Sequence, residues 1–350
     1  MSLLTIDGLR MYYGSEDGYV RAADDVSLEL DRGETLGLVG ESGSGKTTIA
    51  RSIIRLLPDN AELVEGSIDL DGTEITELSE RELRKQVRWR NVSMIPQNAM
   101  NSFDPVYTVG TQIVQAITYH EDGVSKEAAK ERARDLFEDL GIDPDRVDDY
   151  PHQFSGGMAQ RAMIALALCL DPKLILADEP TTALDVVIQD RILETIKEMQ
   201  AEIDCAMILI THDISVVSET SDRIAVCYGG RIVEQADAAT IIDEPRHPYT
   251  LGLRNAFPDI ADTDEELISI PGTPPELVDP GEGCRFAPRC PFAQEECWEV
   301  TPEPEEFEDG HVVRCHRADE ADELRELAER KETWEDAHGR VPNPIQGGYD

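Results

Sequence analysis

The stretch that most constrains this chain is a glycine-rich loop that joins an apolar run to an expected helix. The run Glu34–Gly40 (ETLGLVG) has the character of a buried strand, and Ile49–Leu57 (IARSIIRLL) has that of a helix. The loop between them, GESGSGKTT, satisfies the pattern G-x-x-x-x-G-K-T. Such loops surround phosphate groups with backbone N–H groups and the N-terminus of the following helix. The sequence therefore predicts a nucleotide site on an α/β fold, rather than a glycine-rich turn without function.

The residues of this loop have separate expected roles. Lys46 is expected to reach the β- and γ-phosphates of ATP, and the Thr47 hydroxyl is expected to bind Mg²⁺. The other loop residues expected to contact the nucleotide are Gly40, Ser42, Gly43, Ser44, Gly45 and Thr48. ATP and Mg²⁺ are therefore expected ligands of this chain.

Two further apolar runs end in polar side chains. Leu174–Pro180 (LILADEP) contains Asp178, expected to support Mg²⁺ through water, and Glu179, expected to orient or deprotonate the attacking water. Ala206–Asp213 (AMILITHD) contains His212, expected to contact the γ-phosphate. The carboxyl ends of parallel strands meet at the edge of the sheet where α/β proteins bind ligands. This placement favours catalytic roles over solvated acids and a structural histidine.

A second anion site is predicted in the segment FSGGMAQRAMIALALCL. Ser155, Gly156 and Gly157 stand just before an expected helix, and a helix N-terminus of this kind binds anions. One phosphate loop does not need a second anion site in the same chain. We therefore expect this site to cap the ATP of another subunit, so that hydrolysis requires two ATPase domains facing head to tail.

The order of these motifs resembles that of the ABC transporter ATPases, in which LSGGQ-like signatures cap the facing subunit's nucleotide. The signature here reads FSGGM, with Gln160 three residues after Gly157. The resemblance implies that Gln97 is the Q-loop residue, which contacts Mg²⁺ and the membrane partner. It also implies that Ala183–Leu184–Asp185 forms the D-loop, with Asp185 at the dimer seam.

The resemblance also implies an aromatic residue that stacks on adenine. Tyr13 is the expected residue and Tyr12 the alternative, although either could be an ordinary strand aromatic.

Within this family, the chain is most similar to the ATP-binding subunits of dipeptide/oligopeptide importers, over about residues 3–317. The segments that carry the similarity are VGESGSGKT, PHQFSGGMAQR, RHPYTLGL, IPGTPPEL and GCRFAPRCP. This chain departs at Pro96–Gln97 and Phe103–Asp104–Pro105, where relatives tend to have Phe-Gln and Leu-Asn-Pro. Both departures fall in the region that meets the permease.

The similarity implies an ATP-hydrolysing subunit that powers import of di- or oligopeptides, peripheral at the cytoplasmic face of the membrane. Its implied partners are two membrane-spanning permeases, a second and homologous ATPase, and, indirectly, an external substrate-binding protein. Nickel or oligosaccharide import, a soluble ABC ATPase acting on ribosomes or DNA, and a purely regulatory nucleotide-binding protein are the alternatives. The start MSLLTIDGL is unlike a signal peptide, and no apolar run reaches the roughly 20 residues that span a bilayer. We expect a protein of the reducing cytoplasm.

The expected fold is a RecA-like P-loop ATPase core with an antiparallel β layer that includes Gly66–Ile75. An ABC ATPase domain is expected over residues 1–243, with a helical signature subdomain at about 98–158. A small C-terminal metal-binding extension is expected over 244–317, followed by an acidic helical or loose tail over 318–350. The tail carries an apolar stripe at Leu324, Leu327 and Trp334 and is expected to be a solvated helix.

Four cysteines gather in the expected extension, at Cys284, Cys290, Cys297 and Cys315. Disulfides are rare in the cytoplasm, so the cluster indicates a four-thiolate metal site, although its spacing is wider than zinc or ferredoxin patterns and names no metal. The family resemblance implies a [4Fe–4S] cluster, since Arg289 and Pro291 around Cys290 also match. A structural role is expected rather than electron transfer, because nothing in ATP-driven import demands redox chemistry. Zinc and four unmetallated thiols are the alternatives. The other cysteines, Cys169, Cys205 and Cys227, lie in apolar runs and are expected in the core.

The net charge of −40 is extreme, and only seven of the 32 basic residues are lysines. Such a charge argues against nucleic acid as a partner. Because the acidic residues are spread along the whole chain, they indicate solvent adaptation rather than a binding patch. At molar salt the Debye length falls to about 3 Å, which screens their repulsion. We interpret this as the surface of a halophile, by expectation an archaeon.

Overall fold

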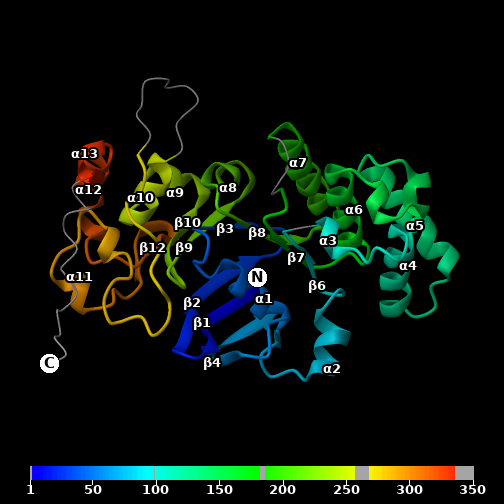
Figure 1. The fold of residues 1–350 in the computed structure, drawn as a ribbon, viewed down its shortest axis with the longest axis horizontal. Coiled ribbons are helices and arrows are strands. Elements are labelled where there is room, and N and C mark those ends of the chain that lie inside the picture. The colour runs from blue at the N-terminus through cyan, green and yellow to red at the C-terminus, as the bar shows by residue number, and fades with distance from the viewer. Residues whose placement is uncertain (1, 98, 182–185, 257–267, 336–350) are drawn as a thin grey trace.

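The computed structural model describes residues 2–97, 99–181, 186–256 and 268–335, which form two sheets surrounded by helices (Figure 1). The strands are β1 (Ser2–Ser15), β2 (Gly18–Asp31), β3 (Thr35–Val39), β4 (Ala61–Leu70), β5 (Thr73–Glu74), β6 (Val92–Ile95), β7 (Leu174–Asp178), β8 (Ala206–Thr211), β9 (Arg223–Tyr228), β10 (Arg231–Asp237), β11 (Glu305–Glu306) and β12 (Val312–Val313). The α-helices are α1 (Lys46–Ile54), α2 (Glu80–Glu82), α3 (Ala99–Ser102), α4 (Val109–His120), α5 (Lys126–Asp139), α6 (Gly156–Leu168), α7 (Val186–Ile203), α8 (Ile214–Thr220), α9 (Ala238–Asp243), α10 (Pro248–Asn255), α11 (Glu296–Glu299), α12 (Ala321–Ala328) and α13 (Lys331–Glu335).

The main sheet has eight strands in the order β11-β12-β10-β9-β3-β8-β7-β6. Strands β9, β3, β8, β7 and β6 run parallel, and every residue of β3, β7 and β8 is buried. A parallel sheet is covered on both faces, which explains the uninterrupted apolar runs in the sequence. The three predicted strands and the α/β class are confirmed.

Successive residues of these strands face two separate hydrophobic cores, because side chains alternate across a strand. In β7, Leu174 and Leu176 pack in a core with α1 and the second sheet. Ile175 and Ala177 pack in the other core, which includes α6 and α7. The second sheet has the order β2-β1-β4-β5 and is antiparallel, as predicted for the β layer.

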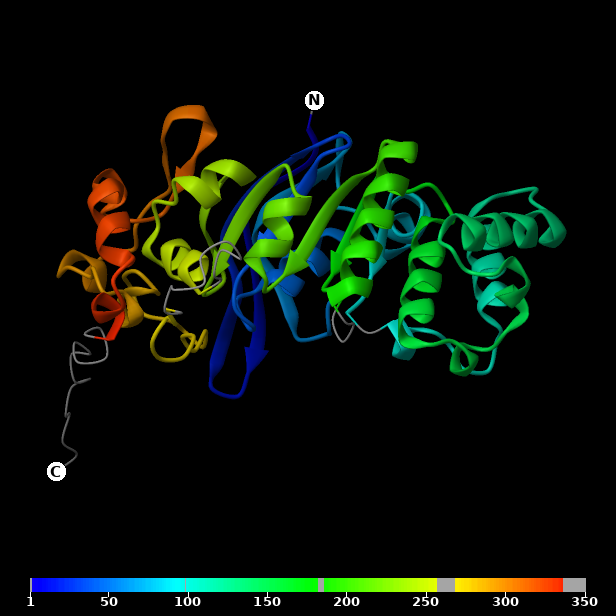
Figure 2. The ribbon, with the colours of Figure 1, turned by 90° about the horizontal axis from the view of Figure 1, so that it is seen from above.

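The region predicted to be a helical insertion contains α3, α4 and α5, and it lies at one end of the molecule (Figures 1 and 2). Ser125 caps the N-terminus of α5, and its side chain accepts a hydrogen bond from the Ala128 N–H group. The buried residues Ala129, Ala133 and Phe137 follow at four-residue spacing, so one face of α5 packs inward.

The C-terminal extension lies at the opposite end of the molecule and adds strands to the main sheet (Figures 1 and 2). Strand β12 pairs antiparallel with β10, so that Val313 lies opposite Glu234. The extension and the ATPase core are therefore joined by one continuous hydrogen-bonded sheet.

The expectation of a solvated terminal helix is wrong for α12 and α13. Leu324 is fully buried, and Trp334 is only 2% exposed. The Trp334 indole N–H group donates to the Ala328 carbonyl at 2.9 Å, and its ring lies against Gly252 of α10. The apolar stripe is thus covered by α10, which the tail sequence alone does not show. No helix within the described ranges is both long and apolar enough to cross a membrane.

Candidate active site

The phosphate loop leaves the carboxyl end of β3 and enters α1 in a conformation that requires glycine. Gly45 has φ 107°, and a Cβ atom there would lie 2.0 Å from the Ala22 carbonyl oxygen. Gly40 has φ 156°, and a Cβ atom there would lie 2.1 Å from the Cys227 carbonyl oxygen. The loop therefore passes between β2 and β9 with no room for side chains at these two positions. Ser42 and Gly43 at its tip are exposed.

Lys46 lies folded back over this loop. Its ammonium group donates to the carbonyls of Gly40 and Glu41 at 2.7 and 2.8 Å, and lies 3.4 Å from the Ser44 hydroxyl. Burial lowers the pKa of Lys46. Gly45 is the N-cap residue of α1, and as a glycine it has no side chain to accept from the first N–H groups of the helix. The first N–H groups of this helix and a buried cation thus converge where a phosphate would be bound.

Thr47 and Asp178 meet at the carboxyl edge of the sheet. The Thr47 hydroxyl donates to the Asp178 carboxylate at 3.2 Å. Asp178 is buried at the end of β7, and this burial raises its pKa. A hydroxyl and a carboxylate are the hard oxygen ligands that Mg²⁺ prefers, so this pair fits the metal.

Glu179 lies between Gln97 and His212. The Gln97 side-chain amide donates to one carboxylate oxygen at 2.6 Å, and His212 Nδ1 lies 3.2 Å from the other. Glu179 has φ 47°, a left-handed conformation that is uncommon for its residue type, and its N–H group donates to the Ile210 carbonyl at 2.9 Å. Strained residues of this kind cluster at functional sites. Three segments far apart in the sequence therefore converge on one carboxylate.

The two candidate adenine-stacking tyrosines point in different directions, because neighbouring side chains alternate across β1. The Tyr13 hydroxyl lies 3.1 Å from the Thr48 hydroxyl, next to the phosphate loop. The Tyr12 hydroxyl instead donates to buried Asp24 at 2.6 Å, and burial raises the pKa of Tyr12 to about 12. This geometry favours Tyr13 for the adenine contact.

The second predicted anion site lies at the start of α6. Ser155 is its N-cap residue and accepts from the Met158 N–H group at 3.4 Å, while Gly156 is exposed with open space around it. Gln160 differs from these residues. It is only 5% exposed, and its amide nitrogen has no hydrogen-bond partner in the part of the chain that the structure describes. The predicted D-loop, Ala183–Leu184–Asp185, falls outside the described residues.

The four cysteines of the extension line one small cavity of about 20 Å³, together with His247 and Phe286. Burial raises the pKa of Cys284 to about 11 and that of Cys290 well above its usual value. No group of three or more histidine, cysteine, aspartate or glutamate side chains among the described residues is arranged to hold a metal ion. The thiols thus share a cavity, but the predicted metal-binding extension is not shown.

Sequence reasoning missed a large groove beside the helical segment. It has a volume of about 1000 Å³ and is lined by α4 and the loop before it, by Arg84 and Arg88, and by Leu166 of α6. Tyr119 on this groove is 75% exposed and Tyr107 is 46% exposed. The signal in the sequence is the pair of aromatic residues Tyr107 and Tyr119, because aromatic side chains that stay exposed often mark an interaction surface.

Comparisons with known proteins cover most of the chain. Residues 23–182 match the family described as ABC transporter, and residues 233–297 match that described as oligopeptide/dipeptide transporter, C-terminal region. The chain is 43% identical to the dipeptide transport ATP-binding protein DppD of Escherichia coli (strain K12), over 90% of this chain and 97% of that protein. It is 45% identical to the oligopeptide transport ATP-binding protein OppD of Bacillus subtilis (strain 168), over 89% of this chain and 88% of that protein.

A solved structure extends these similarities to the fold. The ATP-binding cassette MJ0796, a dimer in a post-hydrolysis state bound to ADP and Pi, superposes with a TM-score of 0.61 at 27% sequence identity. The match covers 67% of this chain and 98% of that one.

Proposed function

Since the chain belongs to the ABC transporter family, among the ATP-binding subunits of dipeptide and oligopeptide transporters, we propose that its ATPase activity powers the import of di- or oligopeptides through a membrane permease. The fold is that of an ABC ATPase cassette, and the chain is an ATPase. The observation that carries the mechanism is the convergence of Gln97 and His212 on Glu179, beside the pair formed by Thr47 and Asp178.

The proposed mechanism assigns one role to each of these groups. Lys46 exchanges its loop carbonyl partners for the β- and γ-phosphates of ATP. Thr47, Asp178 and Gln97 would hold Mg²⁺, which would neutralise charge on the phosphates. Glu179 accepts a proton from the attacking water or orients it, and His212 contacts the γ-phosphate.

A second ATPase subunit completes each site in this proposal. Ser155 and Gly156 are exposed at the start of α6, in the helical segment rather than beside the phosphate loop (Figure 1). From there they cap the nucleotide of the facing subunit, with Asp185 at the seam. We propose that this subunit is a homologous relative of the chain rather than a second copy.

We further propose that the groove on the helical segment binds the permease. Exposed Tyr107 and Tyr119 suit an interface, because aromatic residues supply large contact area. The groove also includes Asp104. Two permeases, served by an external substrate-binding protein, would place the subunit at the cytoplasmic face of the membrane.

For the cavity lined by cysteines we propose a [4Fe–4S] cluster with a structural role, because metal binding energy becomes folding energy. The four thiols that line one cavity fit this donor set. Iron and acid-labile sulfide in the purified protein would support the cluster. Stoichiometric zinc would exclude it.

The proposed function is tested by transport in vesicles that contain the chain with its permeases, its partner ATPase and its binding protein. ATP-dependent uptake of a labelled dipeptide is expected, and vesicles with Glu179→Gln should accumulate none. Uptake of nickel or an oligosaccharide in place of peptide would reassign the cargo. ATP hydrolysis that responds to ribosomes or DNA but not to the permeases would reject the transport function.

A further inference from the structure

Two arginines extend from the cysteine-lined cavity to the nucleotide site. Arg285 directly follows Cys284, and Arg289 directly precedes Cys290. Both arginine side chains are only 6% exposed, so each charge needs partners within the protein. Those partners lie in the phosphate loop, in β2 and in the turn between β9 and β10.

Arg289 binds the phosphate loop directly. Its guanidinium donates to both carboxylate oxygens of Glu41, at 2.6 and 2.9 Å. The same guanidinium donates to the Pro271 carbonyl at 2.7 Å and to the Tyr228 hydroxyl at 3.3 Å. A bidentate arginine–carboxylate pair fixes geometry as well as adding energy. Arg289 therefore fixes the side chain of Glu41 relative to the extension.

Glu41 is in turn bound to the residues expected to contact the phosphates. Its carbonyl accepts from the Lys46 ammonium group at 2.8 Å, and its N–H group donates to the Tyr249 hydroxyl at 2.9 Å. A displacement of Glu41 would move the loop backbone and the lysine together. Sequence reasoning missed this contact, because position 41 is a variable position of the loop motif and its partner lies far along the chain.

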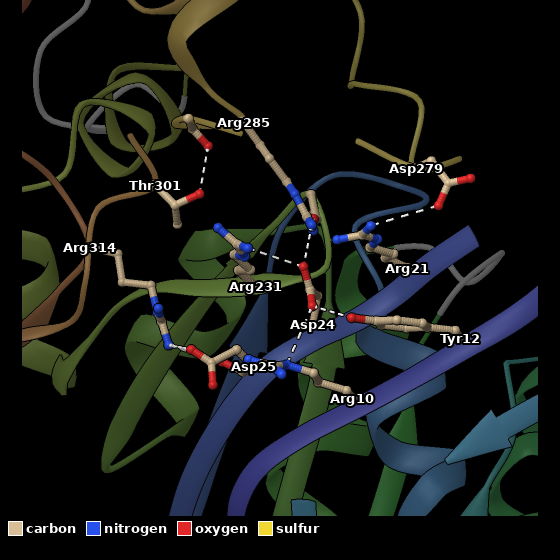
Figure 3. A network of polar contacts seen from close by, with 12 residues as sticks. Arg10, Tyr12, Arg21, Asp24, Asp25, Arg231, Asp279, Arg285, Thr301 and Arg314 are labelled. Carbon is tan, nitrogen blue, oxygen red and sulfur yellow. Dashed lines mark hydrogen bonds and ion pairs between the residues drawn. The ribbon is translucent and has the colours of Figure 1, made fainter. Parts of the chain in front are cut away.

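Arg285 belongs to a network of polar contacts centred on Asp24 of β2 (Figure 3). It donates to buried Asp24, which also accepts from Tyr12 at 2.6 Å and from Arg231 at 3.1 Å. Tyr12 precedes Tyr13, the expected adenine contact. Arg285 also donates to the Gly229 carbonyl.

The turn that contains Gly229 contacts the phosphate loop. The N–H group of Gly230 donates to the Ser44 carbonyl at 2.8 Å. Arg289 therefore contacts the phosphate loop directly, and Arg285 contacts the turn that binds this loop as well as Asp24, the partner of Tyr12.

We propose that Arg285 and Arg289 are positioning residues for ATP, through which the cysteine-lined segment of the extension sets the nucleotide affinity. The proposal rests on the proposed function of the nucleotide site. It gives the extension a role in ATP binding as well as in folding. If Arg285 and Arg289 had only a structural role, their substitution would lower the stability of the protein and leave the ATP affinity of the folded protein unchanged.

The first test is a double-mutant cycle on the full-length chain at molar salt, with equilibrium binding of a fluorescent ATP analogue as the readout. Arg289→Lys keeps the charge but loses the bidentate geometry, and Glu41→Gln keeps the size but loses the charge. Each single variant should bind about tenfold more weakly, equivalent to about 1.4 kcal/mol. The double variant should be no weaker than either single one, because both remove the same contact.

Arg325→Lys is the control, since Arg325 lies in α12, beyond the extension, and pairs with exposed Asp322. It should leave the affinity within about twofold of the wild type, the range expected for a surface pair. Folded Arg289→Lys protein with wild-type affinity would overturn the proposal, as would losses that simply add in the double variant. Wild-type protein that bound no ATP would instead reject the proposed function.

The second test disturbs the cysteine segment itself. Cys290→Ser should weaken binding of the analogue about as much as Arg289→Lys, with faster hydrogen exchange in the phosphate-loop peptide. Cys205→Ser, at a buried cysteine outside the extension, is the control. If Cys290→Ser does not fold, removal of iron from the wild type with a chelator replaces it. Unchanged affinity and exchange in the treated protein would contradict the proposal.

Discussion

At the residue scale, contacts with its neighbours hold the Glu179 carboxylate in place. It takes a left-handed backbone conformation at the end of β7, and its carboxylate lies between Gln97 and His212. The sequence indicated each of these residues separately, from apolar strands that end in polar side chains and from a family motif. Their mutual contacts required the folded sheet, which brings the ends of β7 and β8 together.

Glu179→Gln replaces the carboxylate by an amide of the same size. Binding of an ATP analogue should persist, while steady-state phosphate release should fall by at least about 100-fold, the lower range for a general base. Glu198→Gln, at an exposed position of α7, is the control and should retain wild-type hydrolysis. Turnover that survives in Glu179→Gln would remove Glu179 from this role.

His247 predicts a pH dependence of stability. Burial lowers the pKa of its imidazole from 6.5 to about 4, and its Nδ1 atom accepts from the Tyr249 N–H group. Between these two values the unfolded chain binds a proton that the folded protein excludes. Stability therefore falls as pH falls from 6.5 to 4, by up to about 1.4 kcal/mol per pH unit from this group.

His247→Asn keeps an acceptor at the N-terminus of α10 and removes the titration. The variant should show a shallower loss of unfolding free energy between pH 6.5 and 4, measured by denaturant titration at molar salt. His152→Asn, at an exposed histidine, should follow the wild-type slope. Identical slopes for the wild type and His247→Asn would contradict the prediction.

At the scale of elements, long periodic segments were predictable and short ones were not. The strand before the phosphate loop could be predicted from its apolar run, and so could the strands that lead to Asp178 and to His212. Strands β11 and β12 have two residues each, too few for any period to be visible. Strand β12 pairs on the edge that β10 offers, and β11 pairs in turn on β12.

Leu324→Ala tests the burial of α12 against α10. Removing a fully buried leucine side chain should lower the unfolding free energy by about 2–5 kcal/mol, because a cavity remains. Glu326→Ala, at an exposed position of the same helix, should change it by less than about 0.5 kcal/mol. Chemical denaturation at molar salt measures both. Equal, small effects would indicate that the helix is solvated after all.

At the scale of the whole molecule, the net charge of −40 predicts a fold whose stability depends on salt, because salt screens the repulsion between the acidic residues. We propose that the protein comes from a halophile and that folding and activity fade below roughly 1 M salt, where screening weakens. Thermal unfolding in a series of KCl concentrations measures this, with sucrose as a stabiliser that does not screen charge. KCl should raise the unfolding midpoint far more than sucrose of equal osmolality. Full stability in dilute buffer would refute the prediction.

The pairing of β12 with β10 affects how truncated versions of the protein should be designed. A fragment that stops at Asp243, where sequence motifs suggest a boundary, would leave the outer edge of β10 unpaired at Glu234 and Gln235, where β12 pairs with it. Open edges of this kind recruit strands from other molecules. Such a truncated product should precipitate when it is expressed, so the core is better studied with its own C-terminal neighbour still attached.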